Sequence, residues 1–462
     1  MNLELLSLPK SLYVSKTEFI GEAILVSDTR KLKQGDIFIG IKGDRFDGND
    51  FFIKAIELGA KVLILQSETS RDEKVKEYIK NYKDISLILV ENSINYLQEL
   101  SKLHLKKWRN GNKKVIAITG SNGKTTTKEM IAYLLSKVLG DKLHFTKGNL
   151  NNHLGLPFTI LELKDEHELA LFEIGTNHFG EIKSLCEICD PDYGIITNIG
   201  SSHLEFLENE QGVFKEKSDL FHWIKNKGVK SSFILNIDDP YLKTLEHDPI
   251  SITSGQSSQD FNWKCFDDHL EGFAKIENPN LIGKHNYKNL SMALSLSMTL
   301  FPKHKSTFIE AAHSFIPQSN RSSWLNYKNK KVFLDAYNAN PSSMEASLIS
   351  YLAFLIKNKI DLNKVLFVIG DMYELGEITS SAHKNIGHLL KDQKVVNAFF
   401  VGQFSQYYLE GFGSAGKTFS SVDDILKDWQ NMIDQYEHIY VKASRGVGLE
   451  KLFKNEQPAL QA

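Results

Sequence analysis

A lysine and three threonines stand directly behind a glycine-broken turn in the stretch VIAITGSNGKTTTKEM, residues 115–130. An apolar segment that predicts a strand precedes the turn, and a segment with helical spacing follows it. Two glycines allow the backbone to curl so that its amides face an anion, and the start of the helix adds positive potential. The lysine can neutralise terminal phosphates, and the next threonine can place its hydroxyl on Mg²⁺. The pattern predicts a nucleoside triphosphate site made of Gly120, Ser121, Asn122, Gly123, Lys124, Thr125 and Thr126.

The turn departs at one position from the general phosphate-loop pattern GxxxxGK[ST], which has a glycine where this chain has Ile118. The alternative interpretation is a helix that happens to begin after a glycine turn. The succession of strand, loop and helix argues against that alternative, because this order is what a phosphate-binding loop requires.

Composition excludes several other classes of protein. The chain has 462 residues, Lys+Arg 55 and Asp+Glu 57, so its net charge is -2 and no basic stripe predicts nucleic acid binding. No apolar run approaches the roughly 18 residues of a membrane span, and MNLELLSLPK does not resemble a leader, so we expect a cytoplasmic protein. Cys186 and Cys189 form a CxxC without a second pair, which favours two half-buried helical cysteines over a zinc site.

Strand-like and helical segments alternate along most of the chain, which predicts an α/β fold with parallel strands. We expect three domains: a small N-terminal α/β domain (1–95), a central ATPase-like domain with a parallel sheet (96–316), and a C-terminal Rossmann-like domain (317–462). The expected strands are 22–27, 36–41, 61–65, 86–90, 113–119, 169–175, 192–199, 232–237, 331–337, 364–370, 398–402 and 438–443. The expected helices are 51–58, 93–108, 124–139, 180–188, 211–224, 287–300 and 306–315.

The compact loop TGSNGKTT, with its extra threonine, resembles the phosphate loop of the Mur ligase family. FEIGTNH places Glu173 at the end of one predicted strand, and TNIGSSHLE places His203 at the end of the next. The resemblance implies that both bind magnesium together with Thr125. Taken singly, Glu173 could be a surface residue and His203 a structural histidine, but their shared position at strand ends favours the metal.

Further segments match the same family. Lys217, in VFKEKSDLF, stands where the family has a lysine that CO₂ converts to a carbamate; without the resemblance it would be a solvated residue of a charged helix face. GKHNYKNLSMAL supplies Asn286 and Asn289 as candidate nucleotide contacts, with helix capping as the alternative. Arg321 and Asp335 match positions that reach ATP, with an ordinary interdomain pair as the alternative.

Within the family, residues 146–161, 334–344 and 369–383 resemble the enzymes that add D-alanyl-D-alanine to UDP-N-acetylmuramoyl-tripeptide, and residues 28–51 resemble their UDP-sugar segment. The resemblance covers nearly the whole chain. It implies that polar residues of these segments lie near the substrates, although turns and caps also explain asparagine-rich loops. They are Asp28, Thr29, Arg30, Asn149, Asn152, Asn338 and Asn340.

The resemblance also implies ATP-driven amide formation through an acyl phosphate, in a cytoplasmic step of peptidoglycan synthesis. Lys124, Lys217 and Arg321 would be the catalytic residues, two Mg²⁺ ions would assist, and the C-terminal domain would close over ATP. We expect a monomer. Two alternatives stay open at this point: a folylpolyglutamate synthase-like ligase and a non-catalytic ATP-binding scaffold. The sequence does not fix whether the third peptide residue is lysine or a diamino acid.

Overall fold

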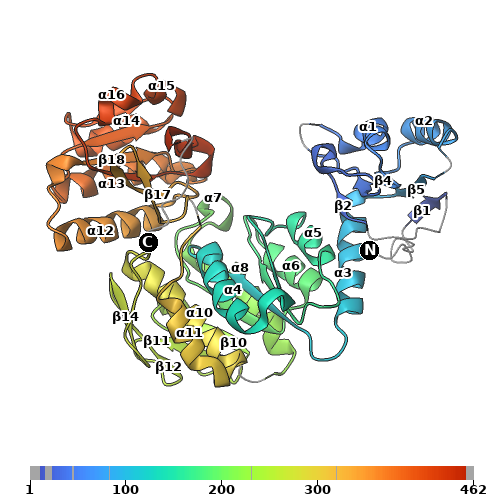
Figure 1. Ribbon diagram of the computed structural model, residues 1–462, viewed down its shortest axis with the longest axis horizontal. Coiled ribbons are helices and arrows are strands. Elements are labelled where there is room, and N and C mark those ends of the chain that lie inside the picture. Colours follow the sequence, from blue (N-terminus) through green and yellow to red (C-terminus); the bar gives the residue numbers. More distant parts are fainter. Residues whose placement is uncertain are drawn as a thin grey trace. The chain divides into compact units, whose positions relative to one another are not determined.

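The computed structural model describes residues 11–15, 23–43, 46–82, 84–229, 232–318 and 320–453, so the expected lack of a leader in the first ten residues lies outside this part (Figure 1). The chain divides into two compact units. The first comprises Met1–Ile116, Lys142–Ile174 and Lys183–Pro191, and the second comprises Ala117–Asp141, Gly175–Ile182 and Asp192–Ala462. None of the helices in the described ranges has the length and apolar character needed to cross a bilayer.

The first unit contains a five-stranded sheet in the order β1-β5-β4-β3-β2, parallel except for β1. Alternate side chains of the strands face opposite sides. Ile37, Ile39, Val62 and Ile64 pack on α3, and Phe38, Leu63 and Leu65 pack on α1 and α2. The elements are β1 Ser11–Val14, β2 Leu25–Val26, β3 Ile37–Ile39, α1 Phe52–Glu57, β4 Val62–Gln66, α2 Thr69–Ile79, β5 Ser86–Val90 and α3 Ser93–Trp108.

A seven-stranded sheet follows, in the order β12-β11-β10-β9-β6-β8-β7. Its strands are short and mostly apolar, as expected of a parallel sheet covered on both faces, with buried polar residues such as Glu173 and Asn236 at strand ends. The strands are β6 Lys114–Thr119, β7 Leu143–Phe145, β8 Leu169–Glu173, β9 Tyr193–Ile196, β10 Phe233–Asn236, β11 Ser251–Gly255 and β12 Phe261–Asn262. The helices of this region are α4 Lys124–Leu139, α5 Gly155–Leu161, α6 Glu181–Cys189, α7 Leu204–Leu207, α8 Glu210–Asn226, α9 Pro240–Lys243, α10 Lys284–Leu300 and α11 Lys305–Ala312.

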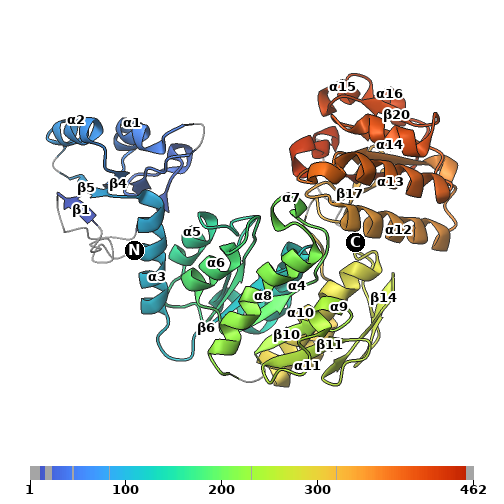
Figure 2. The ribbon, with the colours of Figure 1, turned by 180° about the vertical axis from the view of Figure 1, so that it is seen from behind.

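Helix α10 packs against α4 and is buried around most of its circumference (Figure 2). A small antiparallel sheet of β13 (Lys264–Cys265), β14 (His269–Glu271) and β15 (Ile276–Glu277) also lies against α10. A helix buried on nearly all sides must be apolar or have satisfied polar groups. The asparagines of α10 therefore need partners within the protein.

The C-terminal domain is a six-stranded sheet in the order β16-β17-β21-β18-β19-β20, with only β16 antiparallel (Figure 1). One face packs on α12, α13 and α14, and the other packs on α15 and α16. The elements are β16 Ser323–Tyr327, β17 Lys330–Asp335, α12 Pro341–Lys357, β18 Val365–Gly370, α13 Thr379–Asp392, β19 Ala398–Val401, α14 Ser405–Phe412, β20 Lys417–Phe419, α15 Val422–Leu426, α16 Trp429–Ile433 and β21 His438–Lys442.

The predicted α/β class is confirmed, and the helices expected at 93–108 and 124–139 have those bounds. The strands that were not expected from the alternation, β1, β16 and β13–β15, pair antiparallel, because short strands can pair through a hairpin or return loop without a helical crossover. The cysteines Cys186 and Cys189 lie in helix α6 as expected, but they are fully buried, not half-buried. The residue bounds of the three domains stay a prediction.

Candidate active site

The phosphate loop joins the end of β6 to the start of α4. Gly120 has φ +147° and Gly123 has φ +78°, which are conformations that side chains rarely allow. A Cβ at Gly120 would overlap Thr197, and a Cβ at Gly123 would meet Asn289. Ile118, which replaces the first glycine of the general pattern, is fully buried in β6. The glycine is absent because that position belongs to the strand and not to the curl.

The segment that follows β9 holds the phosphate loop in place through hydrogen bonds. Thr197 Oγ1 and Asn198 Nδ2 donate to the Asn122 carbonyl at 2.6 and 3.0 Å, and Asn122 N donates to Asn198 Oδ1 at 3.0 Å. Ser121 Oγ donates to the Gly200 carbonyl at 2.9 Å. The sequence reasoning used this segment only for His203. The run of hydroxyl and amide side chains directly after a strand was the sequence signal for these hydrogen bonds.

Four predicted nucleotide residues lie at this loop: Lys124, Thr125, Thr126 and Asn289. Lys124 Nζ donates to the Gly120 carbonyl at 2.7 Å, so the ammonium lies inside the curl. Thr125 is buried and Thr126 partly exposed in the first turn of α4. Asn289 of α10 stands against Gly123, and its neighbour Asn286 instead donates to the Ile282 carbonyl at 2.8 Å. The side chain of Asn286 thus contacts the backbone just before α10, whereas the N-cap of this helix is Gly283, so the capping alternative is wrong for Asn286.

Lys217 lies in the interior of the second unit, 1% exposed on α8. Burial lowers the pKa of Lys217 well below its usual value, and the positive charge of Lys124 lowers it further. Its neighbour Glu216 is 2% exposed and accepts from the amides of Gly180 and Ile182 at 2.6 and 2.8 Å. The alternative of a solvated helix face is therefore wrong at these two positions. A neutral amine in a protein interior is a nucleophile.

The candidate metal ligands are Glu173 and His203. Glu173, 1% exposed at the end of β8, accepts from Asn151 Nδ2 at 2.9 Å, and its amide donates to Thr146 Oγ1 at 3.0 Å. His203 precedes α7 in the left-handed region at φ 53°, and its Nδ1 lies 2.8 Å from Oε2 of Glu374. The sequence reasoning missed Asn151 and Glu374.

No group of three or more histidine, cysteine, aspartate or glutamate side chains in the described ranges could hold a metal by itself. Magnesium bound with a nucleotide keeps several waters and takes phosphate oxygens, so it needs only one or two protein ligands. The Thr125 hydroxyl and the His203 imidazole, both in the second unit, are ligand types compatible with that requirement, and Glu173 of the first unit stays a predicted ligand.

Two candidate residues of the C-terminal domain, Arg321 and Asp335, contact different kinds of group: an aromatic ring and a lysine. The Arg321 Cζ lies 3.5 Å from the centroid of the Tyr337 ring, and Arg445 stands 5.0 Å from the same centroid. Asp335 Oδ2 lies 2.6 Å from Nζ of Lys442. Burial opposes ionisation of Asp335, but Lys442 outweighs it and holds the pKa of the carboxyl below its ordinary value. The sequence reasoning missed Lys442.

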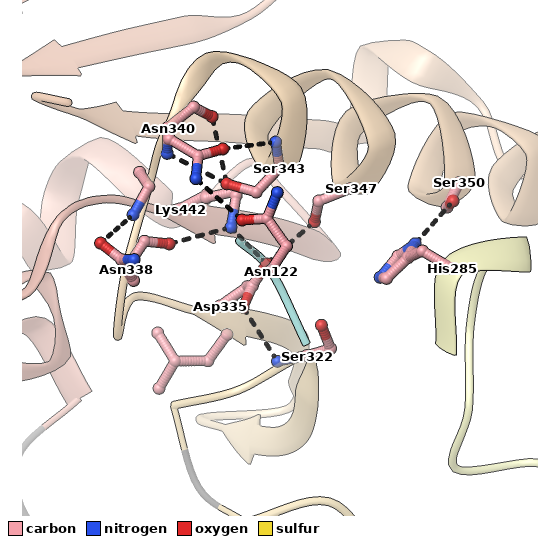
Figure 3. Close-up of polar contacts among 12 residues, drawn as sticks. Asn122, His285, Ser322, Asp335, Asn338, Asn340, Ser343, Ser347, Ser350 and Lys442 are labelled. Atoms are coloured by element: carbon pink, nitrogen blue, oxygen red, sulfur yellow. Dashed lines mark hydrogen bonds and ion pairs between the residues drawn. The ribbon is translucent and has the colours of Figure 1, made fainter. Parts of the chain in front are cut away.

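The loop before α12 reaches the phosphate loop (Figure 3). Asn340 caps α12 by accepting from Ser343 N at 2.9 Å, and its Nδ2 donates to Asn122 Oδ1 at 2.8 Å. Asn122 Nδ2 also donates to Ser342 Oγ at 3.0 Å. Asn338, which is exposed, offers its carbonyl to Lys442 Nζ at 3.2 Å. Asn340, expected near the peptide substrates, therefore has a contact with the nucleotide loop.

The remaining candidates lie in the first unit. Asn152 Oδ1 accepts from Gly155 N at 2.9 Å in the turn that leads into α5, and Asn149 is exposed. Arg30 donates to both oxygens of Asp28 at 2.9 and 2.8 Å beside Thr29, and this pairing lowers the pKa of Asp28 to about 2. These contacts fix the local loops and leave the substrate roles as predictions.

Three family models match the chain: the Mur ligase family catalytic domain at residues 23–104, the Mur ligase middle domain at 118–297, and the Mur ligase glutamate ligase domain at 320–445. Together they span most of the sequence. The chain belongs to the Mur ligase family.

Curated relatives carry a more specific name. The chain is 30% identical to the UDP-N-acetylmuramoyl-tripeptide–D-alanyl-D-alanine ligase of Bacillus subtilis, over 93% of this chain and 92% of the relative. It is 31% identical to the ligase of that name from Buchnera aphidicola, over 92% of this chain and 90% of the relative.

Solved structures agree with the curated relatives. A crystal structure of MurF from Acinetobacter baumannii superposes with a TM-score of 0.80 at 26% identity, covering 98% of this chain and 97% of that one. The MurF ligase of Thermotoga maritima, solved in complex with ADP, gives a TM-score of 0.75 at 25% identity, covering 93% and 96%.

Proposed function

We propose that this chain is an ATP-dependent ligase that joins D-alanyl-D-alanine to UDP-N-acetylmuramoyl-tripeptide in peptidoglycan synthesis. The observation that carries the chemistry is the phosphate loop, which is held by hydrogen bonds and keeps Lys124 near the buried Lys217. The likeness to relatives of that name over more than nine tenths of the chain supports the choice of substrates. No observation favours a folate-chain ligase or an inactive scaffold.

The first step activates the terminal carboxylate of the tripeptide. One carboxylate oxygen attacks the γ-phosphorus of ATP, the bond from that phosphorus to the β-phosphate oxygen breaks, and an acyl phosphate and ADP form. Loop amides of residues 120–123 and the Lys124 ammonium would face the phosphates and stabilise the negative charge that develops. Arg321 and Asp335 would meet the nucleotide from the C-terminal domain. Two bound Mg²⁺ ions would neutralise phosphate charge when present, with Thr125, Glu173, His203 and modified Lys217 as their ligands.

Lys217 would become an anion by carbamylation. Its neutral amine attacks CO₂, so that a new N–C bond forms and a proton leaves to solvent, which gives a carbamate. The lowered pKa supports this step, because only the unprotonated amine can react. Carbon NMR with labelled bicarbonate tests it: a carbamate signal is expected from the wild type and not from Lys217→Met.

In the second step the free amine of the dipeptide attacks the acyl carbon, and phosphate leaves. An acyl phosphate hydrolyses in water, so the C-terminal domain would exclude solvent as it closes. Asn340 supports this role, because its contact with Asn122 joins the domain to the nucleotide loop. We place Asn286 and Asn289 near the nucleotide.

The remaining polar candidates, Asp28, Thr29, Arg30, Asn149, Asn152 and Asn338, would lie near the UDP-sugar or the peptides. The nucleotide-linked substrate and ATP place the reaction in the cytoplasm, and we expect a monomer.

The test is phosphate release measured with each substrate omitted in turn. Release that requires both UDP-N-acetylmuramoyl-tripeptide and D-alanyl-D-alanine, with the pentapeptide product seen by mass spectrometry, is the expected result. Release without the dipeptide indicates a plain ATPase, and the absence of release with either peptide indicates a scaffold. Lys124→Ala should abolish turnover while the fold persists; near-normal turnover in that variant would remove Lys124 from the mechanism.

A further inference from the structure

A histidine and a glutamate in strained backbone conformations meet in the second unit. His203 has φ 53° and Glu374 has φ 62°, and each is a residue with a side chain in the left-handed region. Such conformations are unfavourable for residues with a Cβ and persist where surrounding contacts hold them, often at functional sites. Here the two strained residues bring Nδ1 of His203 to 2.8 Å from Oε2 of Glu374.

Glu374 lies on the loop after β18. A second residue of this loop packs against α7. Gly376, in the left-handed region at φ +57°, faces Glu205 of α7, and a Cβ there would be in ordinary van der Waals contact with the Cβ of Glu205, at 3.7 Å. The glutamate therefore reaches His203 from a loop that is packed on the helix beginning at that histidine. The contact is part of how the C-terminal domain meets the β9–α7 connection.

One ring nitrogen of His203, Nδ1, makes this contact. Nδ1 is buried, and the carboxylate that lies beside it, at 2.8 Å, is that of Glu374. His203 has a side-chain exposure of 21% and Glu374 of 52%. A carboxylate next to Nδ1 holds the proton on that nitrogen and leaves the lone pair on Nε2.

We propose that Glu374 is a positioning residue for His203: it fixes the tautomer and orientation of the imidazole so that Nε2 is presented to the nucleotide-bound divalent cation. This inference rests on the proposed function, in which His203 is a metal ligand. Because Glu374 comes from the C-terminal domain, the imidazole is fully oriented only when that domain is docked. Docking and metal–nucleotide binding therefore favour each other, and by linkage the coupling is reciprocal.

An ordinary surface ion pair would predict a different outcome. Exposed pairs contribute little to stability and do not act on a bound metal. An orienting carboxylate behind a ligating histidine changes metal affinity about tenfold to a hundredfold. The two interpretations therefore separate in a measurement of metal binding that does not depend on turnover.

The experiment titrates the full-length protein with Mn²⁺ in the presence of a non-hydrolysable ATP analogue and follows free Mn²⁺ by electron paramagnetic resonance. Glu374→Ala should bind Mn²⁺ at least about tenfold more weakly, and Glu374→Gln, which keeps one acceptor oxygen, should fall between it and the wild type. Glu377→Gln is the matched control, because it removes an exposed carboxylate from the same loop and should bind like the wild type. Thermal unfolding of all three variants should stay close to that of the wild type.

A second variant removes the histidine itself. In a His203→Gln background, Glu374→Ala should have no further effect on Mn²⁺ affinity, since the two residues act as one group. Unchanged Mn²⁺ affinity in Glu374→Ala, or an equal loss with and without His203, overturns the proposal. Failure of the proposed function is distinct: it would appear as wild-type protein that binds Mn²⁺ and the analogue but forms no amide from the two peptides.

Discussion

Nζ of Lys442 lies 2.6 Å from Oδ2 of Asp335, and their side chains are 3% and 14% exposed. This ion pair holds two loops at once, because Asp335 Oδ1 accepts from Ser322 N at 3.2 Å and Lys442 Nζ donates to the carbonyl of Asn338. The first loop carries Arg321 and the second leads to Asn340. The pair thus fixes the edge of the C-terminal domain that carries the proposed nucleotide contacts (Figure 3).

Lys442→Met should destabilise the C-terminal domain by about 3–5 kcal/mol, because it leaves a buried carboxylate without its partner. Urea unfolding followed by tryptophan fluorescence measures this, since Trp429 is 2% exposed in the same domain. Replacing both partners, with Asp335→Leu added, should recover most of the stability. Lys331→Met, at an exposed lysine of β17, is the control. A loss below about 1 kcal/mol in the single variant would mean that the pair does not hold the loops.

Gly123→Ala should weaken ATP-analogue binding by at least about tenfold, because its Cβ would push Asn289 away from the phosphate loop in a conformation that also disfavours alanine. Gly111→Ala is the matched control: its φ is +70°, yet nothing lies within 4 Å of the added Cβ. Fluorescent nucleotide titration compares the two. Equal affinities for both variants would show that a Cβ at Gly123 does not disturb the nucleotide site, and that the contact with Asn289 has no part in binding.

Asn340→Asp should preserve stability while lowering kcat/KM for ATP about tenfold. Aspartate is as good a helix cap as asparagine, but it removes the donor to Asn122 Oδ1 and places a negative charge near the phosphates. Asn340→Ala should lose the cap as well and cost about 1 kcal/mol. Steady-state kinetics at varied ATP, together with thermal unfolding, separates the effects. If Asn340→Asp keeps wild-type kinetics, the contact between Asn340 and the loop has no part in turnover.

Stability should fall with acid because of His144. Burial lowers its pKa to about 4, and its Nε2 donates to the Thr159 carbonyl at 2.8 Å while its ring stacks on His167. The unfolded chain binds this proton near pH 6.5 and the folded chain only near pH 4, so stability is lost as pH falls through that window, at no more than about 1.4 kcal/mol per pH unit.

His144→Gln should flatten the pH dependence of unfolding between pH 6.5 and 4, since glutamine keeps a donor and cannot titrate. His388→Gln, at an exposed histidine of α13, should retain the wild-type slope. Chemical unfolding at a series of pH values gives both slopes. A slope that His144→Gln leaves unchanged would assign the acid sensitivity to other groups.

Hydrophobic periodicity and phosphate-loop chemistry were enough to predict most of the core elements. The strand ending at Thr119 and the helix beginning at Lys124 are where the pattern placed them, because apolar burial and glycine punctuation act locally. Edge strands such as β1 and β16 were missed, since they bury little and their pairing depends on contacts distant in sequence. Helix α5 was missed because it has only seven residues.

The site was predictable where a residue's role is local, and not where it depends on a distant partner. The curl of Gly120 and Gly123 follows from its own sequence. The burial of Lys217 does not, because a lysine among charged neighbours looks solvated until the fold encloses it. Lys442 and Glu374 also look ordinary in the sequence, and only the folded chain brings them to Asp335 and His203.

The central claim is that the phosphate loop transfers the γ-phosphoryl group of ATP to the tripeptide carboxylate. The most direct measurement uses UDP-N-acetylmuramoyl-tripeptide with ¹⁸O in both oxygens of its terminal carboxylate, supplied with ATP and D-alanyl-D-alanine. An acyl phosphate predicts that each phosphate released carries one ¹⁸O while the new amide keeps the other. Phosphate free of label, formed in step with the amide, would contradict the account.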